Sequence, residues 1–462
     1  MHDEINLEFI TLSFTRLALG VQLVLAGAEL PSKYCKKEWK SLALLLGPGM
    51  SGMWLCSSLL MWALIPHVTF LYALAIAACI TPTDPVLSNS IVKGKFADKN
   101  IPKELQNLII AESGANDGLG YPFLFFALYL IKYAGMGGIG QPNPGVGTAF
   151  KYWFAETWFY VIIMSVVYGG VTGWLAKSAL RFAKKRQWID RENFLVFPIA
   201  VALFTMGTCG LIGTDDLLAC FVAGNTISCG DYFREETENA DFQPPIDMLL
   251  NMAIFMWFGA VCPWYEFVHN HGVMPIYRLV PLGLLILIFR RLPVVLAMSK
   301  QIWQCHNLTH SLFVGYFGPI GVGACFYLHV GLEFLHLTEV DGHTRKDAEH
   351  LREQFRIVVW FVIMCSIVIH GLSVPLGKMG FKIEREVHQT VTEIANHTLV
   401  LIKERTINPI KDIVHHGKQQ HDDDLTKPPQ VHSTKAGDWM TSEDESGTSL
   451  PLQKYRRQDE LV

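Results

Sequence analysis

The chain alternates between long apolar stretches and short polar connections as far as residue 378. Residues 42–65 contain no charged side chain, residues 153–175 contain only Glu156, and residues 277–298 contain only three arginines. An apolar run of about 18 residues or more is long enough to cross a bilayer as a helix. The pattern therefore predicts an all-α polytopic membrane protein with about eleven spans. The predicted spans are 9–29, 41–65, 68–90, 105–131, 153–176, 194–212, 215–228, 246–264, 275–298, 311–333 and 355–377.

Lysine and arginine gather in every second connection between these spans. The basic connections are 30–40, 91–104 and 177–192, and the alternate ones, poor in both residues, are 65–68, 132–152 and 265–274. Short basic connections stay in the cytosol. The pattern thus predicts that the chain starts outside, crosses the lipid bilayer and ends in the cytosol. Connection 334–354 is an exception, because it is basic on the predicted external side.

A change of composition divides the chain in two. We predict a transmembrane domain over residues 1–378 and a cytosolic tail over residues 379–462. Apolar residues between Ile383 and Ile402 lie close to helical spacing, which predicts an amphipathic helix at the start of the tail. After Pro409 the sequence is rich in His, Asp, Lys, Ser and Pro, which is typical of disorder.

Composition and charge alter this interpretation little. The chain is 50% hydrophobic and 17% charged, a lower share of charge than soluble domains carry. The net charge of −4 gives no reason to expect a nucleic-acid partner. The ten cysteines show no Cys-x-x-Cys spacing, so we interpret them as small apolar residues of helices and predict no cofactor.

A pair of prolines interrupts one predicted span. The sequence Thr-Pro-Thr-Asp-Pro, residues 81–85, places Asp84 between Pro82 and Pro85. Proline lacks an N–H group and disfavours helix in the residue before it, so the helix should break there. Broken helices are tolerated inside a membrane only where they line a cavity, and transporters use them to build ion sites near the midplane. The alternative is a helix that ends before this motif, with Asp84 in a surface turn.

Two carboxylates lie inside the predicted span 105–131. Helical spacing places Glu112 and Asn116 on one stripe, and Ser113 and Asp117 on the adjacent stripe. Two neighbouring carboxylates do not both ionise readily in a medium of low dielectric constant. Such a pair suits a group that carries a proton. The alternative is a polar patch with a purely structural role.

A second interruption lies in the predicted span 311–333. Residues 315–321, Gly-Tyr-Phe-Gly-Pro-Ile-Gly, should break the helix at Gly318 and Pro319. Two interrupted spans in the two halves of a chain are the sequence sign of an inverted-repeat transporter. We therefore predict an inverted-repeat fold with two discontinuous helices that cross. The alternative is a flexible but continuous helix.

Two adjacent arginines, Arg290 and Arg291, lie well inside another predicted span. A buried guanidinium group needs a carboxylate partner. Glu112 is the natural candidate, which would leave Asp84 and Asp117 to bind an ion. The alternative is that both arginines mark the cytosolic end of the span.

Three further polar residues each have two open interpretations. Asp215 and Asp216 either line an access funnel for ions or cap the N-terminus of a helix, where acidic residues are favoured. His370 is either a hydrogen-bonded packing residue or a group that carries a proton.

Six segments taken together resemble one known family. They are TPTDPVLS, LIIAESGANDG, DDLLACFVAG, RRLPVV, GYFGPIGV and IVIHGLSVP. They resemble the fungal plasma-membrane sodium/proton antiporters, which belong to the cation/proton antiporter superfamily, over residues 10–380. TPTDP followed by ESGxND is a specific combination, whereas GYFGPIG alone is a weak one. The resemblance implies a homodimer in the plasma membrane that exchanges Na⁺ for H⁺ by alternating access, with K⁺ and Li⁺ as alternative cations.

The resemblance also implies roles for individual residues. Asp117 would be the main carboxylate that binds the cation or the proton, with Asn116 beside it. Thr83 and Asp84 would lie at the unwound crossing helix, and Ser113 would supply a hydroxyl ligand. Asp117 and Asp84 would then hold the monovalent cation.

The same resemblance implies that Glu112 pairs with a buried arginine, for which Arg290 aligns best. Ile320 stands where many bacterial relatives have an arginine, so no role is carried over to that position. Family members usually have two more spans before the first span found here, and we expect the chain to lack those two.

Two alternatives belong to other classes of protein. An intramembrane aspartyl protease also uses two membrane carboxylates, but its Tyr-Asp and Gly-x-Gly-Asp signatures are absent at Asp84 and Asp117. We therefore predict that the protein is not an enzyme. The other alternative is a non-transporting or regulatory remnant of an antiporter, which the short N-terminal part would favour.

Overall fold

The structure is a computed structural model, and the part of the chain that it describes lies within residues 1–378, the predicted transmembrane domain. It describes residues 2–376, with gaps at 94, 135–144, 190, 232, 235–242, 270–273, 337–338, 341–342, 345–348 and 374. The chain divides into two compact units, Met1–Lys382 and Ile383–Val462, and every described residue belongs to the first. The predicted tail over 379–462, including its amphipathic helix, lies outside the described residues.

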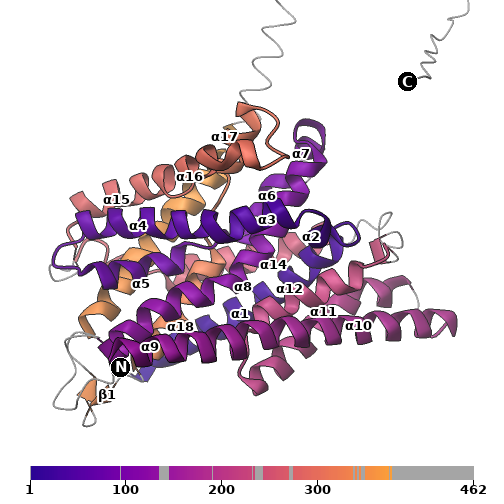
Figure 1. Cartoon of the computed structure of the whole chain (residues 1–462), viewed down its shortest axis with the longest axis horizontal. Coiled ribbons are helices and arrows are strands. Elements are labelled where there is room, and N and C mark those ends of the chain that lie inside the picture. Colours follow the sequence, from indigo (N-terminus) through magenta and orange to yellow (C-terminus); the bar gives the residue numbers. More distant parts are fainter. Residues whose placement is uncertain are drawn as a thin grey trace, which may run out of the picture. The chain divides into compact units, whose positions relative to one another are not determined.

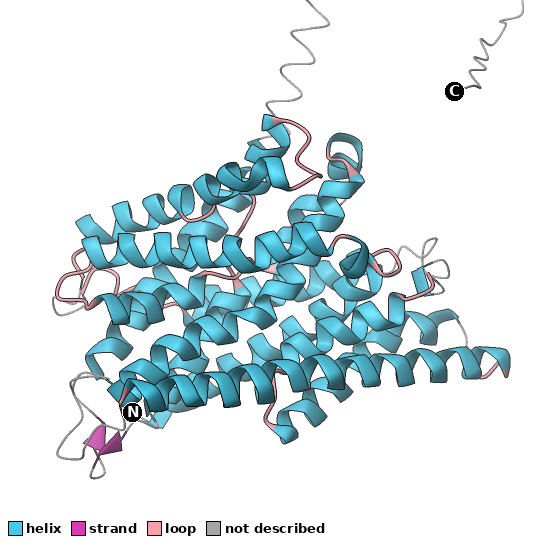
Figure 2. Cartoon of the chain, in the orientation of Figure 1, coloured by secondary structure: helices cyan, strands magenta, loops and turns pink. Residues whose placement is uncertain are grey.

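Helices make up nearly all of this unit (Figure 2). The first half contains α1 (His2–Glu29), α2 (Tyr34–Lys37), α3 (Trp39–Leu44), the π-helical segment η1 (Leu45–Gly49), α4 (Met50–Leu64), α5 (Phe70–Ile80), α6 (Pro85–Val92), α7 (Lys95–Asn100), α8 (Lys103–Ala134), α9 (Val146–Tyr152), the π-helical segment η2 (Trp153–Ile163) and α10 (Met164–Lys185). The second half contains α11 (Arg191–Ile212), α12 (Asp216–Ser228), α14 (Gln243–Val261), α15 (Ile276–Phe289), α16 (Leu292–Met298), the short 3₁₀ turn η3 (Ser299–Gln301), α17 (Leu308–Tyr316), α18 (Val322–His336) and a last helix, Glu349–Ser373.

A short strand pair is the one departure from the all-α prediction among the described residues. β1 (Glu339–Val340) pairs antiparallel with β2 (His343–Thr344), with Glu339 opposite Thr344. Both strands lie in the polar connection 334–354, outside the apolar runs. There the backbone groups of the two strands bond to each other instead of forming a helix.

Five helices of the described chain are long and apolar enough to cross a membrane. They are Leu7–Glu29, Trp39–Leu64, Val146–Lys185, Ile276–Gln301 and Glu349–Ser373. α5 and α6, bent by 46° at a short break, make a sixth span when they are counted together. The apolar helices Val196–Ile212, Asp216–Ser228, Met248–Val261 and Val322–Leu335 are shorter. The structure thus confirms a helical protein with several spans, but not the predicted number of about eleven.

We use the contacts between helices to define two groups, whose members are labelled in Figure 1. We call α1, α10, α11, α12 and α14 the α12 group, because α1, α10 and α11 pack on α12 and α14 packs on α1. We call α4, α5, α6, α8, α15, α16, α17 and α18 the α8 group. In it α5, α6, α17 and α18 pack on α8, α4 packs on α5, α15 packs on α4, and α16 packs on α17. The helix Glu349–Ser373 joins the α8 group, since its Ser366 hydroxyl accepts the N–H of Ile320 at 2.8 Å. The two groups meet where α1 contacts α18 and where α12 contacts α8.

Glycines bring α12 into backbone contact with both of its neighbours. A Cβ atom at Gly224 of α12 would lie 2.3 Å from the carbonyl oxygen of Val24 in α1. A Cβ atom at Gly173 of α10 would lie 2.5 Å from the carbonyl oxygen of Ala223 in α12. No side chain fits at such distances, so these positions require glycine. The close packing holds the C-terminal half of α12 against α1 and α10.

Candidate ion-binding site

Two helices are broken where the sequence predicts, and the two breaks touch. Residues 81–84 separate α5 from α6, and residues 317–321 separate α17 from α18. The N–H of Asp84 donates to the carbonyl oxygen of Pro319 at 2.9 Å, which joins one break to the other. The alternative of a continuous helix over 311–333 is therefore wrong. The four predicted break residues, Pro82, Pro85, Gly318 and Pro319, all lie in or beside a break.

Asp84 caps the N-terminal ends of two half-helices at once. Its Oδ2 atom accepts the N–H of Leu87 in α6 at 2.8 Å. Its Oδ1 atom accepts the N–H groups of Val322 at 2.6 Å and Gly323 at 3.1 Å, in the first turn of α18. The side chain is buried, so the alternative of a surface turn is wrong. Three N–H donors and two helix N-termini stabilise the negative charge of this carboxylate.

Arg290 occupies the complementary position at the carbonyl ends of the broken helices. Its Nη1 group donates to the carbonyls of Ile80, Thr81 and Pro82, where α5 ends. Its Nη2 group donates to the carbonyl of Gly318, just after α17. The last carbonyls of a helix have no partner within the helix and carry partial negative charge. The buried guanidinium group supplies both the hydrogen bonds and the opposite charge.

Glu112 pairs with Arg291, and the predicted pairing with Arg290 is wrong. Nη1 of Arg291 lies 2.5 Å from Oε1 of Glu112, and Nη2 lies 2.7 Å from Oε2. The two side chains are only 3% and 1% exposed. The helix is interrupted between α15 and α16 at these two arginines, so their side chains reach different partners. Both arginines are engaged inside the protein, which contradicts the alternative of a pair at the end of a span.

A chain of hydroxyl groups joins the α5–α6 break to α8. The amide nitrogen of Asn116 donates to the Thr83 hydroxyl at 2.8 Å, and its amide oxygen accepts the Thr83 N–H at 3.2 Å. The Thr83 hydroxyl lies 3.1 Å from the Ser113 hydroxyl, which lies 3.1 Å from the Ser88 hydroxyl in α6. All four side chains are buried. Asn116 therefore fixes the unwound segment against α8 and leaves several oxygens in one small region.

Asp117 is the carboxylate of the site that remains unengaged. It is 0% exposed, and neither of its carboxylate oxygens has a hydrogen-bond partner among the described residues. Gly323 provides the space beside it, since a Cβ atom at Gly323 would lie 2.2 Å from Oδ1. The carboxylates of Asp84 and Asp215 are near enough for their charges to act on it. A buried carboxylate without a partner is costly, and a bound cation or proton would relieve that cost.

Residues 4–376 match the family described as "Sodium/hydrogen exchanger, transmembrane". The chain belongs to this family. The family predicted from the motifs is thereby confirmed, and the protease alternative does not fit it.

Named relatives agree with this assignment. The chain is 40% identical over 387 residues to a probable Na⁺/H⁺ antiporter of Schizosaccharomyces pombe. The aligned region covers 82% of this chain and 49% of that protein. It is 37% identical over 385 residues to a Na⁺/H⁺ antiporter of Saccharomyces cerevisiae. Here the aligned region covers 81% of this chain and 38% of that protein. The chain thus spans about half, or less, of the length of these two relatives.

A solved structure of low sequence identity shares this fold. The sodium proton antiporter MjNhaP1 from Methanocaldococcus jannaschii, determined at pH 8, matches with a TM-score of 0.53 and 16% identity. The match covers 79% of this chain and 86% of that one. The helical arrangement is therefore that of a NhaP-like antiporter.

A cavity of about 650 Å³ leads from one side of the described helices toward the site. It lies between the α12 group and the α8 group, and its exposed end carries Lys33 and Lys36 of the basic connection 30–40. Its lining includes Leu218 of α12 and Ala115 of α8, two residues before Asp117. The position fits an access path from the predicted cytosolic side.

The acids that begin α12 have structural partners. Asp215 accepts the N–H groups of Leu217 at 3.0 Å and Leu218 at 3.1 Å, which confirms the capping interpretation. Asp216 pairs with Arg16 of α1 at 2.5 Å. Both aspartates are buried. The second oxygen of Asp215 has no partner among the described residues, so a role of this pair in ion access stays a prediction.

Sequence reasoning missed three residues of the site. The Tyr327 hydroxyl donates to the carbonyls of Asp117 and Gly118 and so holds α18 against α8. The sequence could have indicated Ser88, because it follows Asp84 by about one helical turn and so lies on the same face of the helix. Nothing in the sequence indicated Tyr327 or Arg16, because each of their contacts joins residues about 200 positions apart in the chain.

His370 supports the second broken helix. Its Nε2 atom lies 3.2 Å from the carbonyl oxygen of Tyr316, the last residue of α17. Its Nδ1 atom lies 3.2 Å from the Ser366 hydroxyl. These contacts favour the packing interpretation.

Proposed function

We propose that this chain is the membrane domain of a sodium/proton antiporter, in which Na⁺ and H⁺ compete for one carboxylate. The observation that carries the proposal is the state of Asp117. Glu112 has an arginine partner and Asp84 has three N–H donors, whereas Asp117 is buried without a hydrogen-bond partner among the described residues. A carboxylate in that state has the most to gain from binding a cation or a proton.

The neighbouring oxygens suit a hard monovalent cation. Ligands of this kind are carboxylate, hydroxyl and amide oxygens, and the site offers Asp117, Ser113, Thr83 and Asn116. Asp84 contributes negative charge from nearby while its own oxygens remain bound to helix ends. The set is compatible with Na⁺, with K⁺ or Li⁺ as alternatives.

Competition at one site makes the exchange obligatory. The carboxylate binds either Na⁺ or H⁺, so the two ions travel in opposite directions in successive half-cycles. In the state described here, the wide cavity faces the predicted cytosolic side. The cycle needs a second state in which the α8 group has moved against the α12 group and the site faces outward.

Further features of the proposal rest on the resemblance to fungal antiporters. We propose an inverted-repeat fold of about eleven spans in this chain, with α5–α6 and α17–α18 as the discontinuous crossing helices. The transmembrane domain would be residues 1–378, and residues 379–462 would form the cytosolic tail. The protein would act as a homodimer in the plasma membrane.

Ion flux in proteoliposomes tests the assignment of the site. Asp117→Asn should abolish Na⁺ uptake driven by a pH gradient while leaving expression and folding intact, because it removes the charge and keeps the shape. Glu156→Gln is a matched control, since it removes one carboxylate from an exposed position on η2. Wild-type uptake by Asp117→Asn would refute the site. No uptake by the unmodified chain would favour the non-transporting remnant instead.

A further inference from the structure

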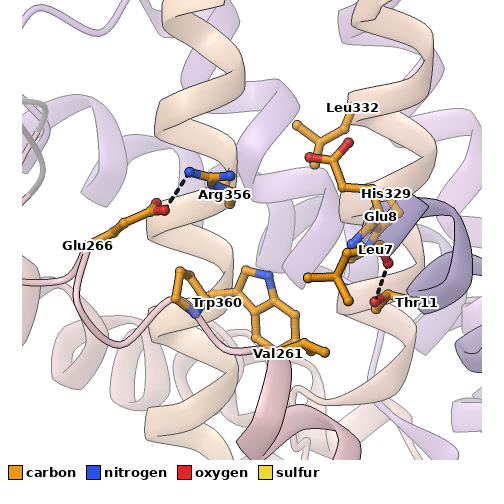
Figure 3. A pocket seen from close by; sticks show the side chains of 10 residues that line it. Leu7, Glu8, Thr11, Val261, Glu266, His329, Leu332, Arg356 and Trp360 are labelled. Carbon is orange, nitrogen blue, oxygen red and sulfur yellow. Dashed lines mark hydrogen bonds and ion pairs between the residues drawn. The ribbon is translucent and has the colours of Figure 1, made fainter. Parts of the chain in front are cut away.

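A second cavity lies between the same two groups of helices, toward the opposite ends of α1 and α18 (Figure 3). Its volume is about 210 Å³. Glu8 of α1 and Glu266, just after α14, line one wall. His329 of α18 and Arg356 and Trp360 of the last helix line the other. The loop charges predict that this cavity is at the external side.

Ion pairs cross the boundary between the groups at this cavity. Nη2 of Arg356 lies 2.6 Å from Oε1 of Glu266, and Figure 3 shows the two side chains reaching toward each other. Nη2 of Arg352, one turn earlier on the same helix, lies 3.8 Å from Oε2 of Glu8. Glu8 belongs to α1 of the α12 group, Glu266 lies in the connection that follows α14, and both arginines belong to the helix Glu349–Ser373.

Each side of this boundary is held together by its own contacts. On one side, the indole N–H of Trp257 in α14 donates to the Thr11 hydroxyl of α1 at 3.2 Å, and its ring lies 5.6 Å from the Phe14 ring. On the other side, a Cβ atom at Gly331 of α18 would lie 3.0 Å from the Phe355 ring of the last helix. α14 also packs on the last helix, because the ring centroids of Phe258 and Trp360 lie 5.2 Å apart, and those of Phe267, next to Glu266, and Phe361 lie 5.3 Å apart. Aromatic contacts therefore accompany the ion pair Glu266–Arg356 across the boundary, whereas Glu8 is part of α1 itself.

We propose that Glu266–Arg356 and Glu8–Arg352 form an external gate, which holds the two groups together while the site faces the cytosol. This proposal rests on the proposed function, because alternating access requires that only one side is open at a time. The cytosolic end of α1 also carries a pair, Glu29 with Lys93 at 2.5 Å. The cavity of about 650 Å³ nevertheless lies at that end, whereas the cavity beside the external pairs has a volume of about 210 Å³. The external pairs therefore lie at the end of the boundary that has the smaller cavity.

Transport measured from each side tests the gate. Arg356→Gln removes the shorter pair and should shift the population toward the outward-facing state. Partly exposed ion pairs change an equilibrium by a small factor, so we expect the half-saturating Na⁺ concentration to fall about two- to fivefold on the external side and to rise on the cytosolic side. The exchanged pair Glu266→Arg with Arg356→Glu should restore wild-type values. Arg234→Gln is the matched control, because its partner Asp231 lies three residues away and within the same segment.

Cysteine labelling provides a readout that does not depend on transport. Thr11→Cys places a thiol in the cavity wall, and labelling of the ten native cysteines is subtracted with the unmodified chain. A membrane-impermeant thiol reagent added outside should label Thr11→Cys faster when Arg356→Gln is also present. Equal labelling rates, or equal shifts of Na⁺ affinity on both sides, would overturn the gate. Faster labelling in a chain that moves no Na⁺ would support the gate and refute the antiport function.

Discussion

Three buried carboxylates lie at or beside the crossing of the broken helices, and they differ in what their oxygens contact. Asp84 accepts three backbone N–H groups, Glu112 accepts two bonds from Arg291, and Asp117 has no partner among the described residues. Two of the three thus have hydrogen-bond donors of the protein on their oxygens. The third is the one that the proposed exchange assigns to the ions, because binding a cation or a proton there would break no contact of the other two.

The pair Glu112–Arg291 gives a prediction for stability. Breaking a buried ion pair by removing one partner costs about 3–5 kcal/mol, because the other charge is left without compensation. Glu112→Ala and Arg291→Ala should each lower the unfolding temperature of the purified protein, and the double variant should recover part of the loss. The same cycle with Glu112→Ala and Arg290→Ala is the control and should be closer to additive, since Arg290 bonds to carbonyls. Full additivity for Glu112 and Arg291 would contradict the pairing.

Sequence reasoning found the polar residues of the site but not all of their partners. A charged residue within an apolar segment can be recognised from the sequence alone. Asp84, Glu112, Asp117 and the two arginines were identified in this way. The choice between Arg290 and Arg291 depends on the direction in which the helix restarts after its break. That direction is set by packing against α5 and α17, and no local pattern records it.

At the scale of elements, the site is built from the ends of four half-helices. A negative side chain lies at the two N-terminal ends, and a positive side chain lies at the two carbonyl ends. Asp84 lies at the N-terminal ends of α6 and α18, and Arg290 lies at the carbonyl ends of α5 and α17. Each charge opposes the partial charge of the helix ends it touches. The prolines and glycines of the two breaks predicted this architecture, since they leave backbone groups without helical partners.

Gly323 gives a prediction at this scale, because it sets the distance between α18 and α8. A methyl group at this position would lie 2.2 Å from an oxygen of Asp117, so Gly323→Ala must displace the carboxylate or the helix. We expect the half-saturating Na⁺ concentration to rise by about tenfold or more, equivalent to about 1.4 kcal/mol of lost binding. Gly207→Ala in α11 is the matched control, because a Cβ atom there meets nothing within 4 Å. Unchanged affinity in Gly323→Ala would show that Asp117 is not the ligand.

Helix lengths were the least predictable feature of the elements. Hydropathy located the apolar segments, but α12 and α18 are shorter than a membrane is thick, and α5–α6 is broken. Such helices are stable because they are surrounded by other helices, as the glycine contacts of α12 show. The spacing of apolar residues along the chain does not show how completely a helix is surrounded by other helices.

At the scale of the whole molecule, competition for one carboxylate predicts the response to pH. Lowering the pH fills Asp117 with a proton, so the half-saturating Na⁺ concentration should rise, by at most about tenfold per pH unit for one proton displacing one cation. The maximal rate should change less, because enough Na⁺ still displaces the proton. The measurement is the rate of uptake against Na⁺ concentration at several pH values. A separate sensor, such as His370 or the histidines at 415, 416 and 421 in the undescribed tail, would instead change the maximal rate.

The wide cavity on the predicted cytosolic side also determines where the membrane voltage acts. In the proposed antiporter, water that enters the cavity of about 650 Å³ would carry the electrical potential of the cytosol inward to Ala115, next to the site. The voltage then falls mainly across the remaining thickness of protein, between Asp117 and the external surface. A cation that enters from the cytosol crosses little of this field, although a full crossing is worth about 2.3 kcal/mol per 100 mV. Voltage therefore acts on the movement of the loaded or empty site between the two sides, and binding from the cytosol is nearly independent of it.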